Sequence, residues 1–131
     1  MIVACLDLEG VLVPEIWIAV AEKTGIDDLR LTTRDISDYD KLMKHRLSIL
    51  DKHGIDINLI QEVISKVDPL PGAVEFMNKL REKFQIIILS DTFYQFGMLL
   101  MKKLCKPTLF CHNLVVDEAG NFVDYKLRRR D

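Results

Sequence analysis

A short run of apolar residues near the start of the chain leads directly into two carboxylates and a glycine. Residues 2–6 are apolar at consecutive positions, and Asp7, Glu9 and Gly10 follow them. Consecutive rather than alternating apolar positions are typical of a parallel strand that is buried on both faces. Because parallel strands need long crossover connections, this feature predicts an α/β fold.

The two carboxylates lie two residues apart. Side chains at this spacing point the same way on an extended chain, so Asp7 and Glu9 can face one site if the strand geometry continues. Gly10 lets the backbone turn closely enough for its N–H to bind an anion. One carboxylate could attack phosphorus while the other transfers a proton. On this motif alone, a turn or helix-start carboxylate is an equally good interpretation.

A second strand-like run, residues 84–89, ends in Ser90, Asp91 and Thr92. In an open α/β sheet, ligands bind at the carboxyl ends of the strands. The two runs would therefore bring the nucleophile and a phosphate-binding hydroxyl to one edge of the sheet. A turn or helix N-cap role is the alternative for Ser90.

The two motifs together resemble those of the haloacid dehalogenase superfamily. Asp-Leu-Glu-Gly-Val at residues 7–11 resembles the first motif, and Ile-Ile-Ile-Leu-Ser at residues 86–90 resembles the second. The resemblance covers essentially all of residues 1–131 and is strongest to the phosphoserine phosphatase branch, including members that also transfer phosphate to homoserine. The later family motifs, a lysine and a Gly-Asp-x-x-x-Asp-like run, do not occur here. The C-terminal part of the core is therefore expected to be missing.

The order of elements and the resemblance predict a Rossmann-like, doubly wound parallel sheet with a helical cap insertion. Residues 1–13 and 72–131 would form the incomplete core, and residues 14–71 the cap. Helix signatures and apolar spacing predict three cap helices, two core helices, a short strand and an edge hairpin. The predicted cap helices cover residues 14–25, 37–54 and 59–67, and the predicted core helices cover 72–83 and 96–104. The short strand covers residues 108–111, and the hairpin is formed by 114–116 and 122–125.

Arg46 interrupts the apolar stripe of the second cap helix. It stands four residues after Leu42 and four before Leu50. An arginine in an inward-facing stripe must either extend its charged end to water or bind an anion. From the residues alone, extension to water is the simpler interpretation.

The resemblance assigns substrate-binding roles in the cap. Arg46 matches the family's arginine that holds the substrate carboxylate, for which a guanidinium offers bidentate geometry. Glu15 matches the acid that receives the substrate ammonium, and Met43 is expected to line the pocket. A favourable interaction with the helix dipole would also explain Glu15, and core packing explains Met43 equally well.

The resemblance also implies a mechanism for phosphoserine. Asp7 attacks phosphorus, while Glu9 protonates the departing serine oxygen and then activates the acceptor, which is water or homoserine. Mg2+ would be bound by Asp7 and the Glu9 backbone carbonyl, together with a later carboxylate. Four groups would hold the phosphoryl oxygens: the Ser90 hydroxyl and the backbone amides of Glu9, Gly10 and Asp91. Glu9 stands where the family usually has aspartate, and Asp91 where it usually has glycine, which leaves the acceptor open.

Composition agrees with a cytoplasmic enzyme, and the resemblance implies a small-molecule substrate, phosphoserine. The net charge of −2 gives no reason to expect nucleic acid as a partner, and the longest apolar stretches are strand-length, which argues against a membrane span. Met1 leads into a strand rather than a signal segment. The three cysteines, with no CxxC spacing, predict reduced thiols in the core. A homodimer remains open.

Two alternatives to an active phosphatase remain. A receiver-type regulatory module also phosphorylates an aspartate on an α/β sheet, but it would need neither a cap-sized insertion nor a buried arginine within it. The other alternative is an inactive fragment of such an enzyme, because the lysine and the later metal ligand of the family do not occur in these residues.

Overall fold

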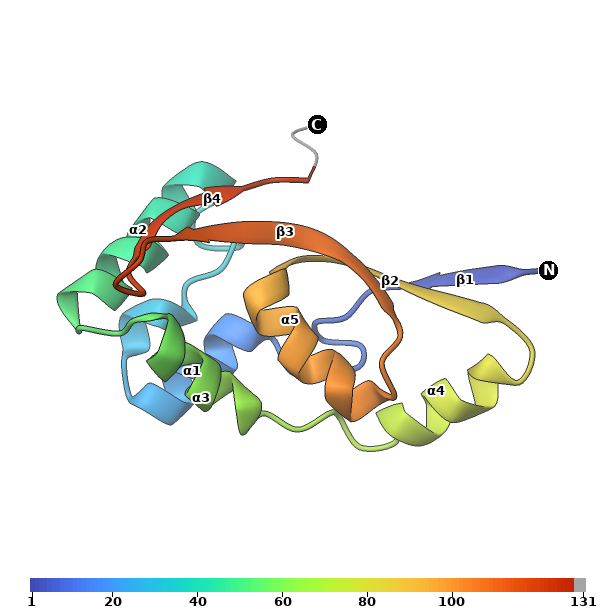
Figure 1. Ribbon diagram of the computed structural model, residues 1–131. Helices are drawn as coiled ribbons and strands as arrows, with labels where there is room; N and C mark the ends of the chain where they lie inside the picture. Colours follow the sequence, from blue (N-terminus) through green and yellow to red (C-terminus); the bar gives the residue numbers. More distant parts are fainter. Residues whose placement is uncertain (129–131) are drawn as a thin grey trace.

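The computed structural model describes residues 1–128, which form a four-stranded sheet with helices packed against it (Figure 1). The strands lie in the order β1 (Val3–Leu6), β2 (Gln85–Phe93), β3 (Thr108–Val116) and β4 (Phe122–Lys126). β1 pairs parallel to β2, β2 pairs parallel to β3, and β4 pairs antiparallel to β3. The predicted α/β class is confirmed, and the predicted hairpin forms an antiparallel edge. The predicted short strand (108–111) and the first strand of the predicted hairpin (114–116) belong to one continuous strand, β3.

The helices form close to the predicted positions. Residues 14–71, the predicted cap, contain α1 (Ile16–Thr24), a 3-10 turn η1 (Asp27–Arg30), α2 (Tyr39–Lys52) and α3 (Ile57–Ser65). The core contains α4 (Ala73–Arg81), α5 (Tyr94–Met101) and the 3-10 turn η2 (Lys102–Leu104). None of the helices within residues 1–128 is long and apolar enough to cross a membrane.

The ends of the cap helices follow from local chemistry. Gly25 ends α1 with φ of 74°, a left-handed conformation that glycine adopts without steric cost. Asp38 caps α2, because its side chain accepts a hydrogen bond from the Lys41 backbone N–H at 3.1 Å. The helix therefore begins at Tyr39, which places that side chain next to the second motif.

The expectation that the strands are buried on both faces is wrong for the described residues. In β2, Ile86 and Ile88 are buried whereas Leu89 is 49% exposed. Val3 of β1, an edge strand, is 47% exposed. Figure 1 shows α4 and α5 on one side of β2 and β3, so that side supplies the core. An unbroken apolar run does not reveal which of its two faces a helix covers.

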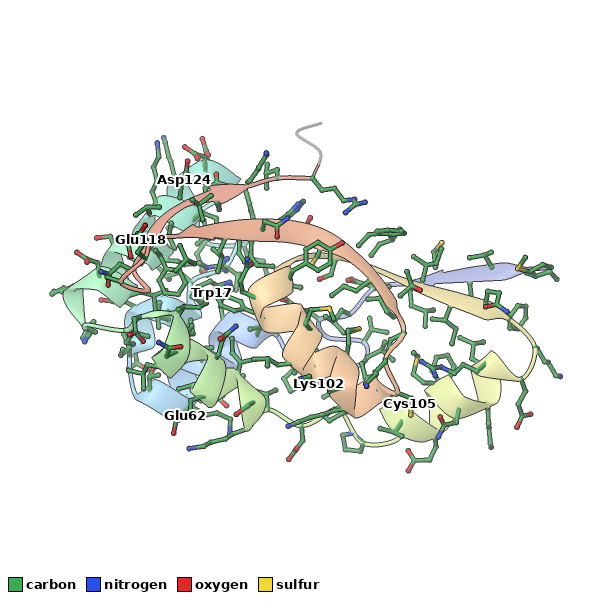
Figure 2. The ribbon with its side chains drawn as sticks, viewed as in Figure 1. Trp17, Glu62, Lys102, Cys105, Glu118 and Asp124 are labelled. Carbon is green, nitrogen blue, oxygen red and sulfur yellow. The ribbon has the colours of Figure 1, made fainter. Side chains whose placement is uncertain are left out.

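An aromatic cluster joins the cap to the core. Trp17 of α1 contacts Phe96 of α5 edge-to-face, with ring centroids 5.6 Å apart, and Figure 2 shows Trp17 in the interior beside α5. Phe96 in turn contacts Phe93 at the end of β2, at 5.8 Å. Because these rings are buried, the cap helix that carries Trp17 is fixed against the strand that carries the second motif.

The β3–β4 hairpin also contacts the cap. The Tyr125 hydroxyl of β4 is hydrogen-bonded to the Asp40 carboxylate of α2, with 2.5 Å between oxygens. The rings of Tyr39 and Tyr125 pack edge-to-face at 5.9 Å. Helix α2, which carries Arg46, is therefore held from its N-terminal end by the edge of the sheet.

We expect Gly97→Ala to destabilise the fold by about 1–3 kcal/mol, because added atoms in a packed core force their neighbours to move. A Cβ at Gly97 of α5 would lie 2.8 Å from Leu109 Cδ2 and 3.3 Å from Thr92 Cγ2. Urea unfolding followed by circular dichroism measures the change. Met98→Ala is the control, since Met98 lies on the same helix and is 50% exposed. Equal midpoints for the wild type and Gly97→Ala would contradict this packing.

Only one of the three cysteines is buried. Cys111 is buried, and burial raises its pKa to about 12, so its thiol stays protonated. Cys5 and Cys105 are exposed, which corrects the expectation that all three are core thiols. All three cysteines are free, as predicted.

Candidate active site

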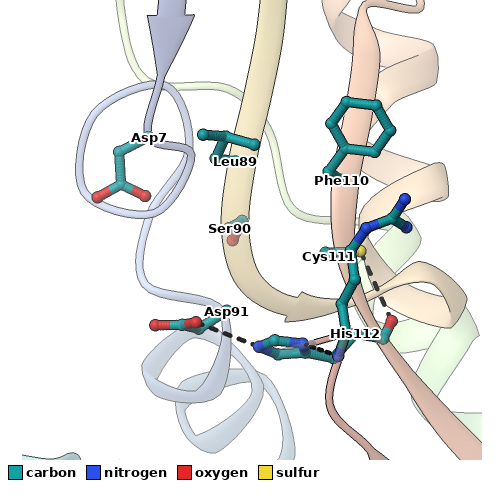
Figure 3. A pocket seen from close by; sticks show the side chains of 8 residues that line it. Asp7, Leu89, Ser90, Asp91, Phe110, Cys111 and His112 are labelled. Atoms are coloured by element: carbon teal, nitrogen blue, oxygen red, sulfur yellow. Dashed lines mark hydrogen bonds and ion pairs between the residues drawn. The ribbon is translucent and has the colours of Figure 1, made fainter. Parts of the chain in front are cut away.

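Asp7 lies where β1 ends, at the wall of an open cavity of about 600 Å³ (Figure 3). The parallel register pairs Leu6 with Ile88, so the residues that follow these two positions lie side by side. This places Asp7 near Ser90, as the sequence predicts, and both line the same cavity. Asp7 is exposed, and one carboxylate oxygen accepts the Leu8 backbone N–H at 2.8 Å.

The chain turns sharply directly after Asp7. The Leu8 carbonyl oxygen accepts backbone N–H groups from Leu12 at 2.9 Å and Val13 at 3.2 Å. Gly10, with φ of 75°, donates its N–H to the Val13 carbonyl at 2.7 Å. The Gly10 N–H, predicted to hold a phosphoryl oxygen, is therefore already used inside the turn.

The turn places Glu9 in a different cavity from Asp7. Strand geometry ends at Leu6, so the two carboxylates do not share a strand face. Glu9 lines a smaller cavity of about 170 Å³ together with Arg46, Glu15 and Asp91. Asp91 also lines the larger cavity. The nucleophile and the acid–base candidate therefore occupy two cavities that share Asp91.

The environment of Glu9 suits proton transfer. Burial raises its pKa to about 7, the nearby Arg46 opposes this shift, and the carboxylates of Glu15, Asp7 and Asp91 add to it. A carboxyl group with a pKa near neutrality populates both protonation states, so it can donate a proton in one step and accept one in another.

Arg46 is buried rather than extended to water, being only 7% exposed. Its guanidinium lies over the Trp17 ring, 4.8 Å from the centroid, and donates to the Leu31 carbonyl at 3.3 Å. The Nε atom is buried and has no hydrogen-bond partner among the described residues. Burial lowers the Arg46 pKa to about 10, so the group remains charged at neutral pH. A fixed guanidinium with an unpaired N–H beside a cavity is suited to binding an anion.

Met43 packs against Arg46 in the interior. It is fully buried, and an Arg46 N–H contacts its Sδ at 3.7 Å. Met43 is not among the residues that line the two cavities. Its position agrees with the core-packing alternative rather than with direct substrate contact.

Glu15 is held by a residue that the sequence did not single out. Arg34 donates from two nitrogens to the two Glu15 carboxylate oxygens, both at 3.2 Å. Glu15 lies at the N-cap of α1 but makes no side-chain capping bond. Arg34 belongs to the loop between η1 and α2, where no sequence signal links it to a position 19 residues earlier.

The second motif lies within β2 rather than after it, because the strand continues to Phe93. The pairing with β3 is irregular between Leu89 and Phe93. Ser90 Oγ accepts the Thr92 backbone N–H at 3.2 Å, a local turn-like bond that the alternative interpretation expected. The Ser90 side chain still borders the cavity of Asp7.

Asp91 is tied to a histidine of the neighbouring strand. His112 Nε2 lies 3.2 Å from Asp91 Oδ1, as the dashed line in Figure 3 shows. On the cap side, the Tyr39 hydroxyl donates to the Asp91 backbone carbonyl at 3.2 Å. Sequence reasoning assigned no chemistry to His112, since only the pairing of β2 with β3 brings it to Asp91.

The predicted Mg2+ site has a compatible but small set of protein ligands. Asp7 offers a carboxylate and Glu9 a backbone carbonyl, and hard cations prefer such oxygen donors. Within residues 1–128, no group of three or more His, Cys, Asp and Glu side chains is arranged to hold a metal. Mg2+ usually keeps several waters and binds substrate phosphate, so two protein oxygens fit its ordinary chemistry.

Two curated bacterial proteins are similar to this chain over nearly its whole length. It is 63% identical over 131 residues to a protein of Pseudomonas aeruginosa named phosphoserine phosphatase ThrH, of which it covers 64%. It is 64% identical over 129 residues to a phosphoserine phosphatase of Pseudomonas syringae pv. tomato, of which it covers 54%. The chain thus spans a little over half to about two thirds of these relatives. No protein-family model matches it.

Solved phosphoserine phosphatases share the fold. The structure from T. onnurineus matches 99% of this chain and 66% of its own, with a TM-score of 0.70 and 28% identity. A phospho-aspartyl intermediate analogue of a phosphoserine phosphatase matches 95% of this chain and 62% of its own, with a TM-score of 0.71 and 17% identity. The sequence relatives confirm the resemblance to phosphoserine phosphatases, and the solved structures confirm the α/β fold.

Proposed function

We propose that this chain, a relative of the phosphoserine phosphatases of the haloacid dehalogenase superfamily, carries the nucleophile, the acid–base group and the amino-acid-binding residues of a Mg2+-dependent phosphoserine phosphatase. The observation that carries the proposal is the pair of adjoining cavities. Asp7 and Ser90 border one, and Glu9 and Arg46 border the other. A phosphoserine bound across the boundary would have its phosphate at Asp7 and its carboxylate at Arg46.

The chemistry begins with Asp7. A carboxylate oxygen of Asp7 attacks phosphorus, the bond from phosphorus to the serine oxygen breaks, and Glu9 gives its proton to that oxygen. Glu9 then takes a proton from water as the water attacks the aspartyl-phosphate. Phosphate leaves and the Asp7 carboxylate is restored. The raised pKa of Glu9 agrees with both proton transfers.

Mg2+ would be held by the Asp7 carboxylate and the Glu9 backbone carbonyl. When bound, it would offset the negative charge that gathers between Asp7 and the phosphate, which is the main requirement of phosphoryl transfer. The Ser90 hydroxyl, beside Asp7, would donate to a phosphoryl oxygen once it turns from its local bond with Thr92.

Arg46 would recognise the substrate carboxylate. Its guanidinium is already oriented by Trp17 and Leu31, so little conformational entropy is lost when an anion binds. The names of the two Pseudomonas relatives agree with a phosphorylated amino acid as substrate. The fold shared with a phospho-aspartyl intermediate analogue agrees with a covalent step on aspartate.

Homoserine is the second candidate acceptor. Glu9 is one methylene longer than the aspartate usual in the family, so the position from which it activates an acceptor differs. We therefore expect added homoserine to compete with water and to yield O-phosphohomoserine. Phosphorus NMR of the products measures the partition between the two acceptors.

A receiver-type module is disfavoured by the cavity around Arg46. A receiver accepts a phosphoryl group on aspartate but has no need of a buried, partly unpaired guanidinium. Such a module would be labelled by a small phosphodonor yet would release no phosphate from phosphoserine. An inactive fragment would do neither. Assays should therefore use the protein with any residues that its gene encodes on either side of these 131.

We expect Glu9→Gln to lower the rate of Mg2+-dependent phosphate release from phosphoserine by about 10²- to 10⁴-fold, because glutamine keeps the shape but cannot transfer a proton. Phosphate release is followed with and without EDTA, which should stop the wild-type reaction. Glu22→Gln, on the exposed face of α1, is the control and should leave the rate unchanged. Unchanged rates in both variants would remove Glu9 from the mechanism.

A further inference from the structure

We propose that the Tyr39 hydroxyl couples the binding of the substrate's amino-acid part at α2 to the phosphate-binding part of β2. The inference rests on the proposed function and adds a positioning residue that it does not use. Tyr39, at the start of α2, donates a hydrogen bond of 3.2 Å to the Asp91 backbone carbonyl, 52 positions away in the sequence. The bond connects the helix that carries Arg46 directly to the strand that carries Ser90.

The bond reaches a part of β2 that the neighbouring strands support little. Pairing with β1 ends at Ile88, and pairing with β3 is irregular between Leu89 and Phe93. The Asp91 carbonyl lies in this irregular stretch, and Tyr39 supplies its hydrogen bond from outside the sheet. Side chains therefore hold the second motif where backbone pairing does not.

The Asp91 carbonyl shares a planar peptide group with the Thr92 N–H. That N–H donates to Ser90 Oγ at 3.2 Å, and Ser90 borders the cavity of Asp7 (Figure 3). Because the two groups point to opposite sides of a trans peptide, Tyr39 holds one side and Ser90 Oγ meets the other. A rotation of this peptide would move the hydroxyl that the proposed mechanism assigns to the phosphate. We call the contacts from Tyr39 through this peptide to Ser90 the Tyr39 link.

The other end of the Tyr39 link lies beside the proposed amino-acid site. Tyr39 and Arg46 are seven residues apart on α2, which is about two helical turns, so both lie on one face of the helix and line the smaller cavity. Burial and the nearby Asp91 raise the pKa of Tyr39, so its hydroxyl keeps its proton and can donate at neutral pH. An anion bound at Arg46 therefore acts on the same helix whose first residue holds the second motif.

Inorganic phosphate and L-serine, the two products of the proposed reaction, test the link without turnover. Calorimetric titration of phosphate in the presence of Mg2+, with and without saturating L-serine, measures the factor by which one ligand tightens the other. In the wild type, serine should raise the affinity for phosphate by about three- to tenfold, as expected for coupling through one neutral hydrogen bond. In Tyr39→Phe, which loses only the hydroxyl, this factor should fall below about twofold, while the affinity for each ligand alone changes by less than about threefold.

Tyr94→Phe is the matched control, because the Tyr94 hydroxyl also donates to a backbone carbonyl, that of Leu109, at 3.0 Å. It should retain the wild-type coupling factor. Ser90→Ala keeps the Tyr39 bond but removes the far end of the Tyr39 link, so its factor should fall like that of Tyr39→Phe. A purely structural role of Tyr39 would lower the unfolding midpoint and weaken both ligands without changing the factor.

Three results would overturn the inference. These are the absence of coupling between serine and phosphate in the wild type, an unchanged factor in Tyr39→Phe, and an unchanged factor in Ser90→Ala. The proposed function is judged separately, by phosphate release from phosphoserine. A protein that hydrolyses phosphoserine without coupling the two ligands would refute the Tyr39 link alone. A protein that couples the ligands but forms no phosphoenzyme at Asp7 would refute the proposed reaction and leave the Tyr39 link standing.

Discussion

Replacing Asp7 by asparagine will abolish the covalent phosphoenzyme and lower phosphoserine turnover by about four orders of magnitude or more, as losses of a catalytic nucleophile do. Asparagine has the same shape, so the end of β1 should be undisturbed, but its amide cannot form an acyl phosphate. Brief incubation with labelled phosphoserine and Mg2+, acid quenching and hydroxylamine treatment would detect the aspartyl-phosphate in the wild type.

Asp51→Asn is the matched control, because Asp51 is an exposed aspartate that borders neither cavity. It should form the phosphoenzyme at the wild-type level. Peptide mapping of the label then locates the modified residue. A hydroxylamine-sensitive label that persists in Asp7→Asn would place the nucleophile elsewhere, and the cavity of Asp7 would lose its assigned role.

Arg46→Ala should reduce kcat/KM for phosphoserine by about 30- to 1000-fold, the effect of losing about 2–4 kcal/mol of charge-assisted binding. Phosphoethanolamine carries the same phosphate and amine but no carboxylate, so its turnover should fall far less. Steady-state kinetics on both substrates gives the difference. Arg46→Lys should recover only part of the loss, since lysine keeps the charge but not the planar fork of donors.

The same substitution also tests whether Arg46 is only structural. Arg46 packs on Trp17 and donates to Leu31, so Arg46→Ala will change stability as well as binding. Arg30→Ala serves as the control, because Arg30 pairs on the surface with Glu22 and Asp27. Equal losses on phosphoserine and phosphoethanolamine, accompanied by a lowered unfolding midpoint, would show that Arg46 supports the fold rather than the substrate.

The elements and the main motif residues could be predicted because they depend on neighbours in the chain. Gly25 ends α1 through its own φ, and the strand pattern of residues 84–89 leads to Ser90, which lines the same cavity as Asp7. The resemblance to the haloacid dehalogenase superfamily came from the order of residues in short motifs such as residues 7–11. The roles assigned to Asp7 and Glu9 remain predictions.

Which side chains meet in the site depends on contacts between segments that are far apart in the sequence. Arg34 meets Glu15 across 19 positions, and His112 meets Asp91 across 21, so no local pattern could indicate either pair. The sequence also placed Asp7 and Glu9 on one strand face, whereas the turn after Leu6 separates them into two cavities.

Local sequence thus determined the helices, the strands and the candidate nucleophile, because backbone propensity and apolar periodicity act over a few residues. Tertiary structure alone decided which strand faces are covered, that Arg46 is buried beside Trp17, and that Asp91 joins the two cavities. These features arise from strand register and from the packing of α2 against the sheet edge, which bring together side chains that the sequence keeps far apart.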